Sequence, residues 1–208
     1  MSLEPHWYST IYSVMVGTGA IVQAFAFVIV VVCLLAERPP LADLITPTVF
    51  NDLGSLLFAF VMVWAYMAFS QFLLIWAGNL PEEIPWYLRR LAGGWQWVAL
   101  LIVLFHFALP FALLLSREFK RNARLVVSVA GLVVLMRLFD TLWLVAPGTA
   151  EQSTLYWLDW VTVVAMGGLW FLVFQRFLRR QPLLPVHTPR VTELLADEDD
   201  DHVAQHAH

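Results

Sequence analysis

The fold of this chain follows largely from one stretch, Asn51 to Trp97, which reads NDLGSLLFAFVMVWAYMAFSQFLLIWAGNLPEEIPWYLRRLAGGWQW. No charged side chain occurs between Leu53 and Ala77. These roughly 25 residues are long enough to cross a hydrocarbon core of about 30 Å as a tilted helix. The stretch therefore predicts a membrane span, then a polar hinge, then a second span that begins at Trp95.

The hinge carries the signals expected where a span leaves the membrane. Asn79 and Pro81 are predicted to end the preceding helix, because neither residue continues a helix well. The sequence PWYLRR at residues 85–90 is typical of a short helix at headgroup level, where aromatic rings and Arg side chains are stabilised. We therefore expect an interfacial helix between the two spans.

The composition agrees with a membrane protein. The 208 residues are 60% hydrophobic and 13% charged, whereas soluble domains contain about 25% charged residues. The formal net charge of -4 reflects an acidic tail, because six of the sixteen acidic residues lie between Glu193 and Asp201. The remainder is only slightly basic, so there is no basis for binding nucleic acid. Cys33 is the single cysteine, which excludes a disulfide or a thiolate metal site within the chain.

Read in order, the chain predicts an all-α, multi-pass membrane helical bundle over residues 1–180. Its five transmembrane helices are expected at about residues 11–36, 52–77, 95–115, 125–146 and 155–178. A Pro-rich loop through Phe50, a basic loop at 116–124 and a short turn at 147–154 connect them. Residues 181–208 bury too little apolar surface to fold and are predicted to form a disordered, acidic cytoplasmic tail. No signal-peptide pattern is expected at the N-terminus.

The distribution of Lys and Arg predicts the orientation. Eight of them fall on one side: Arg38, Arg117, Lys120, Arg121, Arg124, Arg176, Arg179 and Arg180. The opposite side has Arg89 and Arg90, which Glu82 and Glu83 offset. Because basic loops stay in the cytoplasm, the N-terminus is expected outside and the C-terminus inside.

Polar side chains within the spans are the candidate functional residues, because ionisable groups there are costly and usually face a bundle interior or a watery cavity. The ionisable candidates, one or two from each of the last three spans, are His106, Arg137, Asp140 and Asp159. The second span adds the uncharged Tyr66, Ser70 and Gln71. Each has a plain structural interpretation: Gln71 can join helices, and Asp159 can lie near enough to the surface to hydrate.

Arg137 and Asp140 are three residues apart, so they share a helix face and can pair. They form either a neutralised structural pair or a charge pair beside a ligand site or a proton route. His106 is followed four residues later by Pro110. Because proline has no N–H, the His106 carbonyl should lose its helical partner and the span should bend there. The imidazole is either a satisfied core histidine or part of a functional site.

The depths of these groups predict a shared site. At 1.5 Å per residue, Gln71, Asp140 and Asp159 lie about 6–9 Å from the outer ends of their spans, and Arg137 and His106 about 14–16 Å. The five positions on four helices therefore fall in the outer half or at the midplane. They predict a polar cavity that opens outward, whose mouth Glu4 and His6 are placed to line.

Two segments also carry a resemblance to a known family. LLFAFVMVWAYMAFSQFLLIWAGNLPEEIPWYLRR at residues 56–90 and MSLEPHWYSTIYSVMVGTG at residues 1–19 resemble the quinone-binding membrane subunit of bacterial quinol:cytochrome c oxidoreductase. That complex is known as alternative complex III, and the subunit belongs to the NrfD-like polysulfide reductase membrane-subunit family. The resemblance covers roughly residues 1–180. Family members are about twice as long, so it extends only to their C-terminal half.

The resemblance implies a multi-pass subunit in the bacterial inner membrane, beside an iron–sulfur subunit, cytochrome c subunits and a second NrfD-like subunit. Quinol would be the substrate near the periplasmic side, and this chain would contribute quinol binding or proton conduction, with no catalytic residue or metal of its own. The resemblance also implies that iron–sulfur clusters and haem c belong to the partner subunits. This chain has one cysteine, whereas an iron–sulfur cluster needs several, and one intramembrane histidine, whereas haem b in a helical bundle usually takes two. A structural anchor without a quinone site and a proton-linked transporter are the alternatives.

Overall fold

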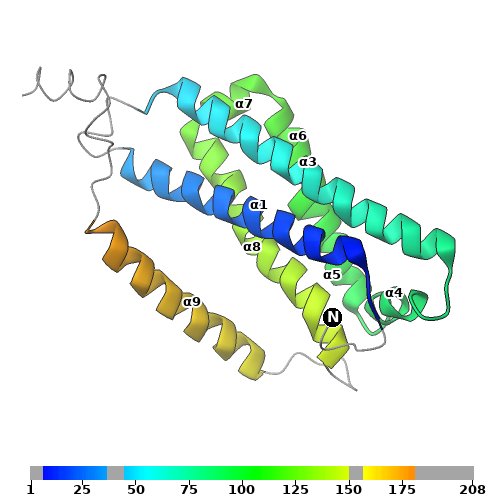
Figure 1. The fold of residues 1–208 in the computed structure, drawn as a ribbon. Coiled ribbons are helices and arrows are strands. Elements are labelled where there is room, and N and C mark those ends of the chain that lie inside the picture. Colours follow the sequence, from blue (N-terminus) through cyan, green and yellow to red (C-terminus); the bar gives the residue numbers. More distant parts are fainter. Residues whose placement is uncertain (1–6, 37–44, 150–156, 181–208) are drawn as a thin grey trace, which may run out of the picture. The chain divides into compact units, whose positions relative to one another are not determined.

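The computed structural model describes residues 7–36, 45–149 and 157–180. In this part of the chain all regular structure is helical (Figure 1). The elements are α1 (Thr10–Leu35), α3 (Pro47–Gly78), α4 (Ile84–Arg90), α5 (Trp95–Ile102), the π-helix η1 (Val103–Ala108), α6 (Leu109–Leu115), α7 (Arg117–Arg121), α8 (Ala123–Thr149) and α9 (Trp157–Leu178).

Five segments of the described chain are long and apolar enough to cross a bilayer. They are Thr10–Leu35, Pro47–Gly78, Trp95–Leu115, Ala123–Gly148 and Trp160–Leu178. The all-α, multi-pass membrane fold with five spans is thereby confirmed. The chain divides into two compact units, residues 1–153 and residues 154–208. The first unit contains four of the spans, and the second contains α9.

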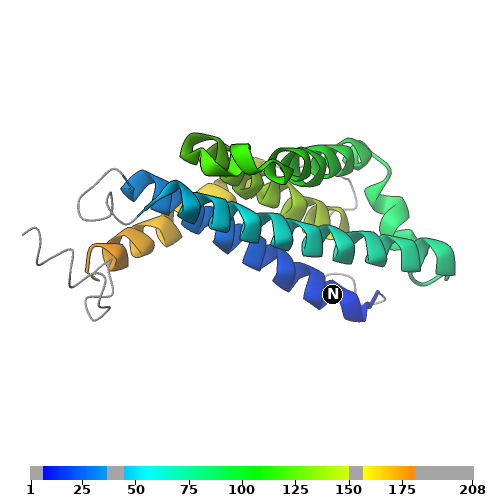
Figure 2. The ribbon, with the colours of Figure 1, turned by 90° about the horizontal axis from the view of Figure 1, so that it is seen from above.

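The first unit is built around α1, which lies against both α3 and α8 (Figures 1 and 2). Buried apolar residues recur on one face of α1 at Val22, Ala26 and Ile29, and Val126 and Val133 of α8 belong to the same cluster. A spacing of three, four or seven residues places side chains on one helical face. The outward faces are also apolar, so helix association here depends on close packing rather than on hydrophobic contrast with the lipid.

Helix α3 begins earlier than the sequence predicts. The sequence predicts Pro47 in the loop and a span that starts near residue 52, but the helix starts at Pro47 with Thr46 as its N-cap residue. Proline is well suited to the first turn of a helix, where its missing N–H costs nothing. At the other end the predicted stop is confirmed. Asn79 adopts a left-handed conformation (φ 44°), and its N–H donates to the carbonyl of Ile75.

Two connections are more ordered than predicted. The basic loop contains the short helix α7, and Ser116 caps it by accepting a hydrogen bond from the Phe119 N–H at 3.5 Å. Helix α8 continues to Thr149 and includes Pro147, whereas the span was expected to end at residue 146. Proline is tolerated there because it removes only one helical hydrogen bond, the one to the carbonyl four residues before it.

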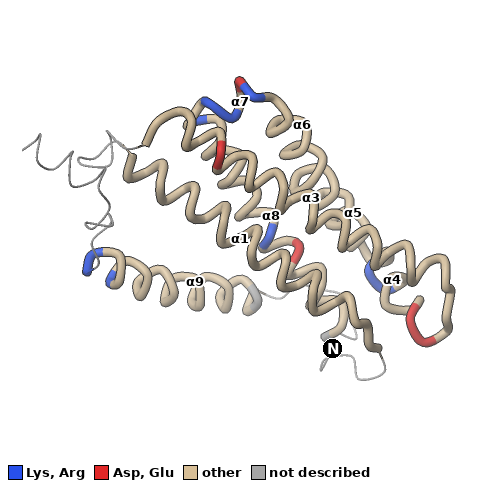
Figure 3. Tube along the Cα trace, turned by 45° about the horizontal axis from the view of Figure 1, so that its top comes forward, with Lys and Arg blue, Asp and Glu red and all other residues tan. Residues whose placement is uncertain are grey.

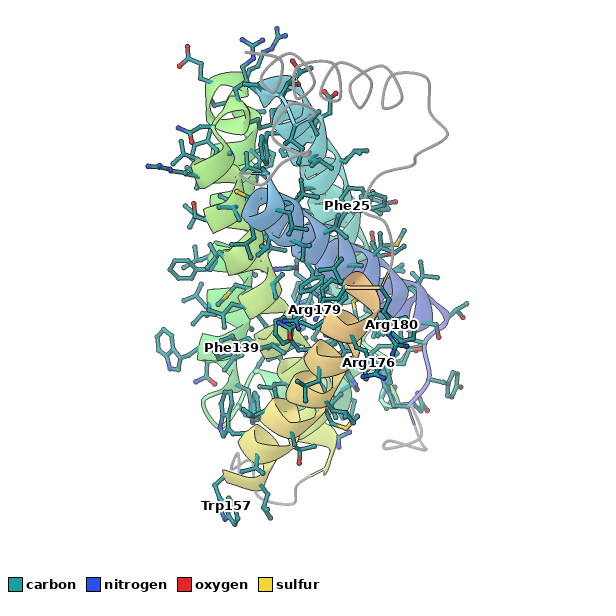
Figure 4. The ribbon with its side chains drawn as sticks, turned by 90° about the vertical axis from the view of Figure 1, so that its left-hand side faces the viewer. Phe25, Phe139, Trp157, Arg176, Arg179 and Arg180 are labelled. Atoms are coloured by element: carbon teal, nitrogen blue, oxygen red, sulfur yellow. The ribbon has the colours of Figure 1, made fainter. Side chains whose placement is uncertain are left out.

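Charged residues in the first unit gather near the ends of the helices, with one adjacent basic and acidic pair inside α8 (Figure 3). In the second unit, α9 has Trp157 at one end, and Arg176, Arg179 and Arg180 lie at the other (Figure 4). Aromatic and basic residues at opposite ends of an apolar helix are typical of a membrane span. The predicted tail at 181–208 lies outside the described residues.

Candidate ligand cavity and buried ion pair

The pair inside α8 is formed by Arg137 and Asp140. The Nη1 group of Arg137 donates to Oδ2 of Asp140, and both residues are only 4% exposed. Gly19 of α1 provides the space for the guanidinium, because a Cβ atom at that position would overlap it. The pairing predicted from the spacing is therefore present, and its position depends on a glycine in a neighbouring helix.

Trp64 of α3 and His106 of η1 extend this pair into a four-residue group, the central cluster: Trp64, His106, Arg137 and Asp140. The Trp64 side chain lies near the carboxylate of Asp140. The His106 ring meets Trp64 edge-on, with 4.3 Å between ring centroids. His106 is fully buried, and within the described residues neither of its ring nitrogens has a hydrogen-bond partner. Because an unpaired buried polar group costs about 1–3 kcal/mol, this histidine is retained at a cost to stability.

The segment around His106 is not a regular α-helix. Val103–Ala108 forms a π-helix, and the N–H of Leu109 donates to the carbonyl of Leu104, five residues before it. The break that Pro110 predicts is thus present as a widened turn that contains His106. π-Helical turns within α-helices are rare and frequent at functional sites.

An apolar cavity of about 600 Å³ lies next to the central cluster. Residues from α1, α3, α4, α5, η1 and α8 line it: Met15, Met62, Trp64, Ala65, Tyr66, Ala68, Phe69, Phe72, Tyr87, Leu91, Ala99, Ile102, Val103, Phe107, Asp140, Trp143 and Leu144. Two of these lining residues, Trp64 and Asp140, belong to the central cluster, and Asp140 is the acidic one. Tyr66 and Phe69 are 67% and 61% exposed, so the cavity opens to the outer surface of the bundle, which faces lipid in a membrane.

Aromatic side chains pack against Tyr87 and Trp143 of the cavity wall. Trp7 stacks on Trp86 with ring centroids 4.7 Å apart, and Trp86 packs edge-on against Tyr87 and Trp143. Burial raises the pKa of the Tyr87 hydroxyl, although the nearby positive charge of Arg90 acts in the opposite direction. The Tyr87 hydroxyl of the cavity wall therefore stays protonated at neutral pH and remains a hydrogen-bond donor.

Arg90 connects this aromatic group to α8. Its Nη1, Nε and Nη2 groups donate to the carbonyls of Trp86 (3.0 Å), Trp143 (3.2 Å) and Leu144 (2.8 Å). Its guanidinium also lies 3.6 Å from the centre of the Trp86 ring. The sequence predicts an interfacial position for the Arg90 side chain, but Arg90 is 1% exposed. It is buried because carbonyls of α8 and the face of an indole ring satisfy it.

The other predicted site residues have different positions. Gln71 is buried away from the cavity wall, and its Oε1 accepts a hydrogen bond from Ser9 at 2.8 Å, as expected of a residue that joins segments. Tyr66 lines the cavity. Asp159 belongs to α9 in the second unit. Glu4 and His6 lie outside the described residues. Of the five positions predicted to converge, the structure thus brings together His106, Arg137 and Asp140.

Sequence reasoning missed Trp64, Arg90 and Trp143. One signal for Trp143 is Pro147, four residues later, which removes the helical donor to the Trp143 carbonyl. Trp64 lies far inside a span, where its indole N–H needs a hydrogen-bond partner. This position in the sequence could have identified Trp64 as a candidate site residue.

These features describe a multi-pass helical membrane protein with an apolar cavity beside a buried ion pair. Within the described residues, no three His, Cys, Asp or Glu side chains are placed to share a metal ion. Comparison with known proteins found no family model that matches this chain and no match among curated proteins.

Proposed function

We propose that this chain is an integral membrane subunit of a respiratory quinol:electron-acceptor oxidoreductase of the bacterial inner membrane, and that its cavity binds the quinol headgroup. The observation that carries the proposal is the cavity itself. Its volume of about 600 Å³ lies within the 300–1,000 Å³ range usual for small-molecule sites. Its apolar wall and its opening toward lipid suit a ligand that reaches it from the bilayer.

The polar groups beside the cavity suit the chemistry of quinol. Oxidation of a quinol removes two electrons and releases two protons. In this proposal the electrons pass to partner subunits that hold iron–sulfur clusters and haem c, and a second NrfD-like subunit completes the membrane part. Asp140 supplies a hydrogen-bond acceptor in the cavity wall, and His106 supplies a buried nitrogen pair without partners among the described residues. Both can serve proton release near the periplasmic side.

The test fills the cavity without changing a polar group. Ala99→Phe adds a ring at a cavity-lining position of α5, and we expect it to reduce quinol oxidation more than tenfold while the chain still assembles. Leu100→Phe is the matched control, because Leu100 is the next residue, is 46% exposed and does not line the cavity. Quinol-dependent cytochrome c reduction in membranes, with the assembled complex quantified, provides the measurement.

If Ala99→Phe leaves quinol oxidation unchanged, the cavity is not the quinol site, and a structural anchor becomes the better proposal. A proton-linked transporter is the other candidate, favoured by the interruption of the third span at η1, since broken helices mark many transport sites. Co-purification separates these candidates: a respiratory subunit brings haem-containing and iron–sulfur-containing partners with it, and a transporter does not.

A further inference from the structure

The C-terminal end of α9 carries a group of basic side chains, the arginine patch: Arg176, Arg179 and Arg180. All three are exposed, and Figure 4 shows them at the same end of the helix. The main chain continues to turn through them, because the N–H groups of Arg179 and Arg180 donate to the carbonyls of Gln175 and Phe177 at 3.1 and 3.0 Å. Spacings of three and four residues from Arg176 therefore place the guanidinium groups around one side of the helix.

A hollow of about 290 Å³ lies at the arginine patch, and Leu172 and Gln175 line it together with the three arginines. Leu172 precedes Gln175 by three residues and Arg179 by seven, so an apolar, an amide and a guanidinium group follow one another along one helix face. Leu172 and Arg179 are about 10 Å apart along the axis. The hollow therefore extends from apolar surface to charged surface over the last two turns.

The positive charge of the patch has no acidic counterpart close by in the described residues of the second unit. Asp159 is the acidic residue among residues 157–180, and at 1.5 Å per residue it lies about 25 Å before Arg176 along the helix. Arginines in a last turn also stabilise the helix dipole, but that role requires no hollow. Three guanidinium groups around one hollow are suited to an anion.

The position of the patch along the span indicates the kind of anion. Trp160–Leu178 is long and apolar enough to cross a bilayer, so the patch lies where this span leaves the hydrocarbon core and meets the lipid headgroups. A guanidinium group binds phosphate through two parallel hydrogen bonds. Leu172 and Val173, which precede the patch, are exposed and can contact acyl chains. A phospholipid supplies a phosphate and acyl chains in one molecule.

We infer that the arginine patch binds the headgroup phosphate of an anionic phospholipid, with the Gln175 amide as a further hydrogen-bond donor and Leu172 against the acyl chains. The inference does not depend on the proposed function, because it concerns the second unit and no residue of the cavity. A zwitterionic phospholipid has the same phosphate, but its own cation cancels the charge and competes with the guanidinium groups. The patch therefore prefers a headgroup with net negative charge.

The test measures binding of two lipids with matched acyl chains to the purified full-length chain in neutral detergent, by native mass spectrometry. Phosphatidylglycerol is the anionic lipid and phosphatidylcholine the zwitterionic one. The parent is expected to bind phosphatidylglycerol about tenfold or more tightly, because each Lys or Arg near an anionic lipid surface contributes about fivefold. Inorganic phosphate at the same concentration should displace little of the lipid, since it has no acyl chains to contact Leu172.

Two replacements of the whole patch separate charge from hydrogen-bond geometry. Glutamine at all three positions (Arg176→Gln, Arg179→Gln and Arg180→Gln) should reduce the preference for phosphatidylglycerol to about twofold or less, because the charge that distinguishes the lipids is gone. Lysine at the same positions keeps the charge that orients a span but loses the paired hydrogen bonds. It should weaken phosphatidylglycerol binding about threefold, the order of one lost hydrogen bond.

A charge-matched control removes three exposed arginines in and beside α7: Arg117→Gln, Arg121→Gln and Arg124→Gln. None of them lines the hollow, so this variant should keep the preference of the parent. An equal loss in the control would show that total charge, and not the patch, selects the lipid. Equal binding of both lipids by the parent would also overturn the inference.

Two further results would assign the patch to another occupant. Displacement of the lipid by an equal concentration of inorganic phosphate would make it a site for a soluble anion. Binding of phosphatidylglycerol only after the six acidic residues between Glu193 and Asp201 are changed to Asn or Gln would mean that this acidic segment occupies the patch. Either result contradicts a phospholipid site in the parent protein.

Discussion

The Nε group of Arg90 donates to the backbone carbonyl of Trp143 at 3.2 Å, and that carbonyl is the one that Pro147 leaves without a helical donor. In a regular helix the N–H of residue 147 would serve it, but proline has none. The side chain from α4 therefore replaces a missing main-chain hydrogen bond in α8. Tyr87, three residues before Arg90, and Leu91, the residue after it, also line the cavity. This contact therefore holds two parts of the cavity wall together.

Arg90→Met is expected to destabilise the chain by about 2–4 kcal/mol. The methionine keeps an apolar stem but removes the donors to the Trp143 and Leu144 carbonyls. The Trp143 carbonyl is then left without a donor, which costs about 1–3 kcal/mol, and the lost hydrogen bond to the Leu144 carbonyl adds about 1 kcal/mol. Pro147→Ala returns an N–H to α8, so the double variant should recover roughly 1 kcal/mol of the loss. Denaturant unfolding in detergent measures the coupling. Arg89→Met, at an exposed neighbouring position, should change stability little; a similar loss there would contradict a specific role for Arg90.

Gly19→Ala is expected to separate the central ion pair from α1 and to destabilise the chain by about 1–3 kcal/mol, the usual cost of overpacking. The added Cβ overlaps the guanidinium of Arg137, which cannot move freely because it is buried and paired with Asp140. Gly17→Ala is the matched control on the same helix, since a Cβ there meets nothing within 4 Å. Thermal unfolding of both variants gives the comparison, and equal melting temperatures would show that Arg137 yields without cost.

Asp140→Leu should impair assembly of the protein, whereas Asp140→Asn should impair quinol oxidation. The leucine leaves Arg137 buried without its partner, which typically costs about 3–5 kcal/mol, so we expect loss of assembled protein. The asparagine keeps the shape and a hydrogen-bond acceptor, so it should assemble but lose quinol oxidation at least tenfold. Assembly is measured by the yield of complex and function by quinol-dependent cytochrome c reduction. Normal turnover by Asp140→Asn would make the pair purely structural.

His106→Gln is expected to assemble and to lower the rate of quinol oxidation. Glutamine keeps a polar side chain but cannot accept a proton on one ring nitrogen and release it from the other, as an imidazole can. The Trp64 ring that contacts His106 is retained, so the packing change is small. A rate of quinol oxidation equal to that of the parent would remove His106 from any proton route.

The orientation with the N-terminus outside and the C-terminus inside is a further prediction, which cysteine labelling can test. On a Cys33→Ser background, Glu83→Cys in the hinge should react with an impermeant maleimide on intact cells. Arg121→Cys, an exposed position at the end of α7, should react only after the membrane is opened. Labelling of Arg121→Cys from outside would reverse the proposed topology.

The spans themselves were predictable because they depend on local composition. An uncharged run such as Leu53–Ala77 satisfies its backbone only as a helix in lipid, whatever the rest of the chain does. The pairing of Arg137 with Asp140 was predictable for the same reason, since a spacing of three residues defines a shared face before any packing. The break before Pro110 follows from one missing N–H. These features need no information about neighbouring helices.

The cavity and the position of Arg90 depend instead on contacts between residues far apart in sequence. The sequence PWYLRR predicts a headgroup-level helix and so an interfacial Arg90. The Arg90 side chain is buried instead, because it donates hydrogen bonds to the carbonyls of Trp143 and Leu144. Trp64 reaches Asp140 from another helix, and Gly19 admits Arg137 from a third. The depth of a residue within its span did not predict which side chains meet, because depth ignores the rotation of each helix about its axis. Gln71 has a depth similar to that of Asp140 but lies against Ser9, since helix rotation is set by packing between helices.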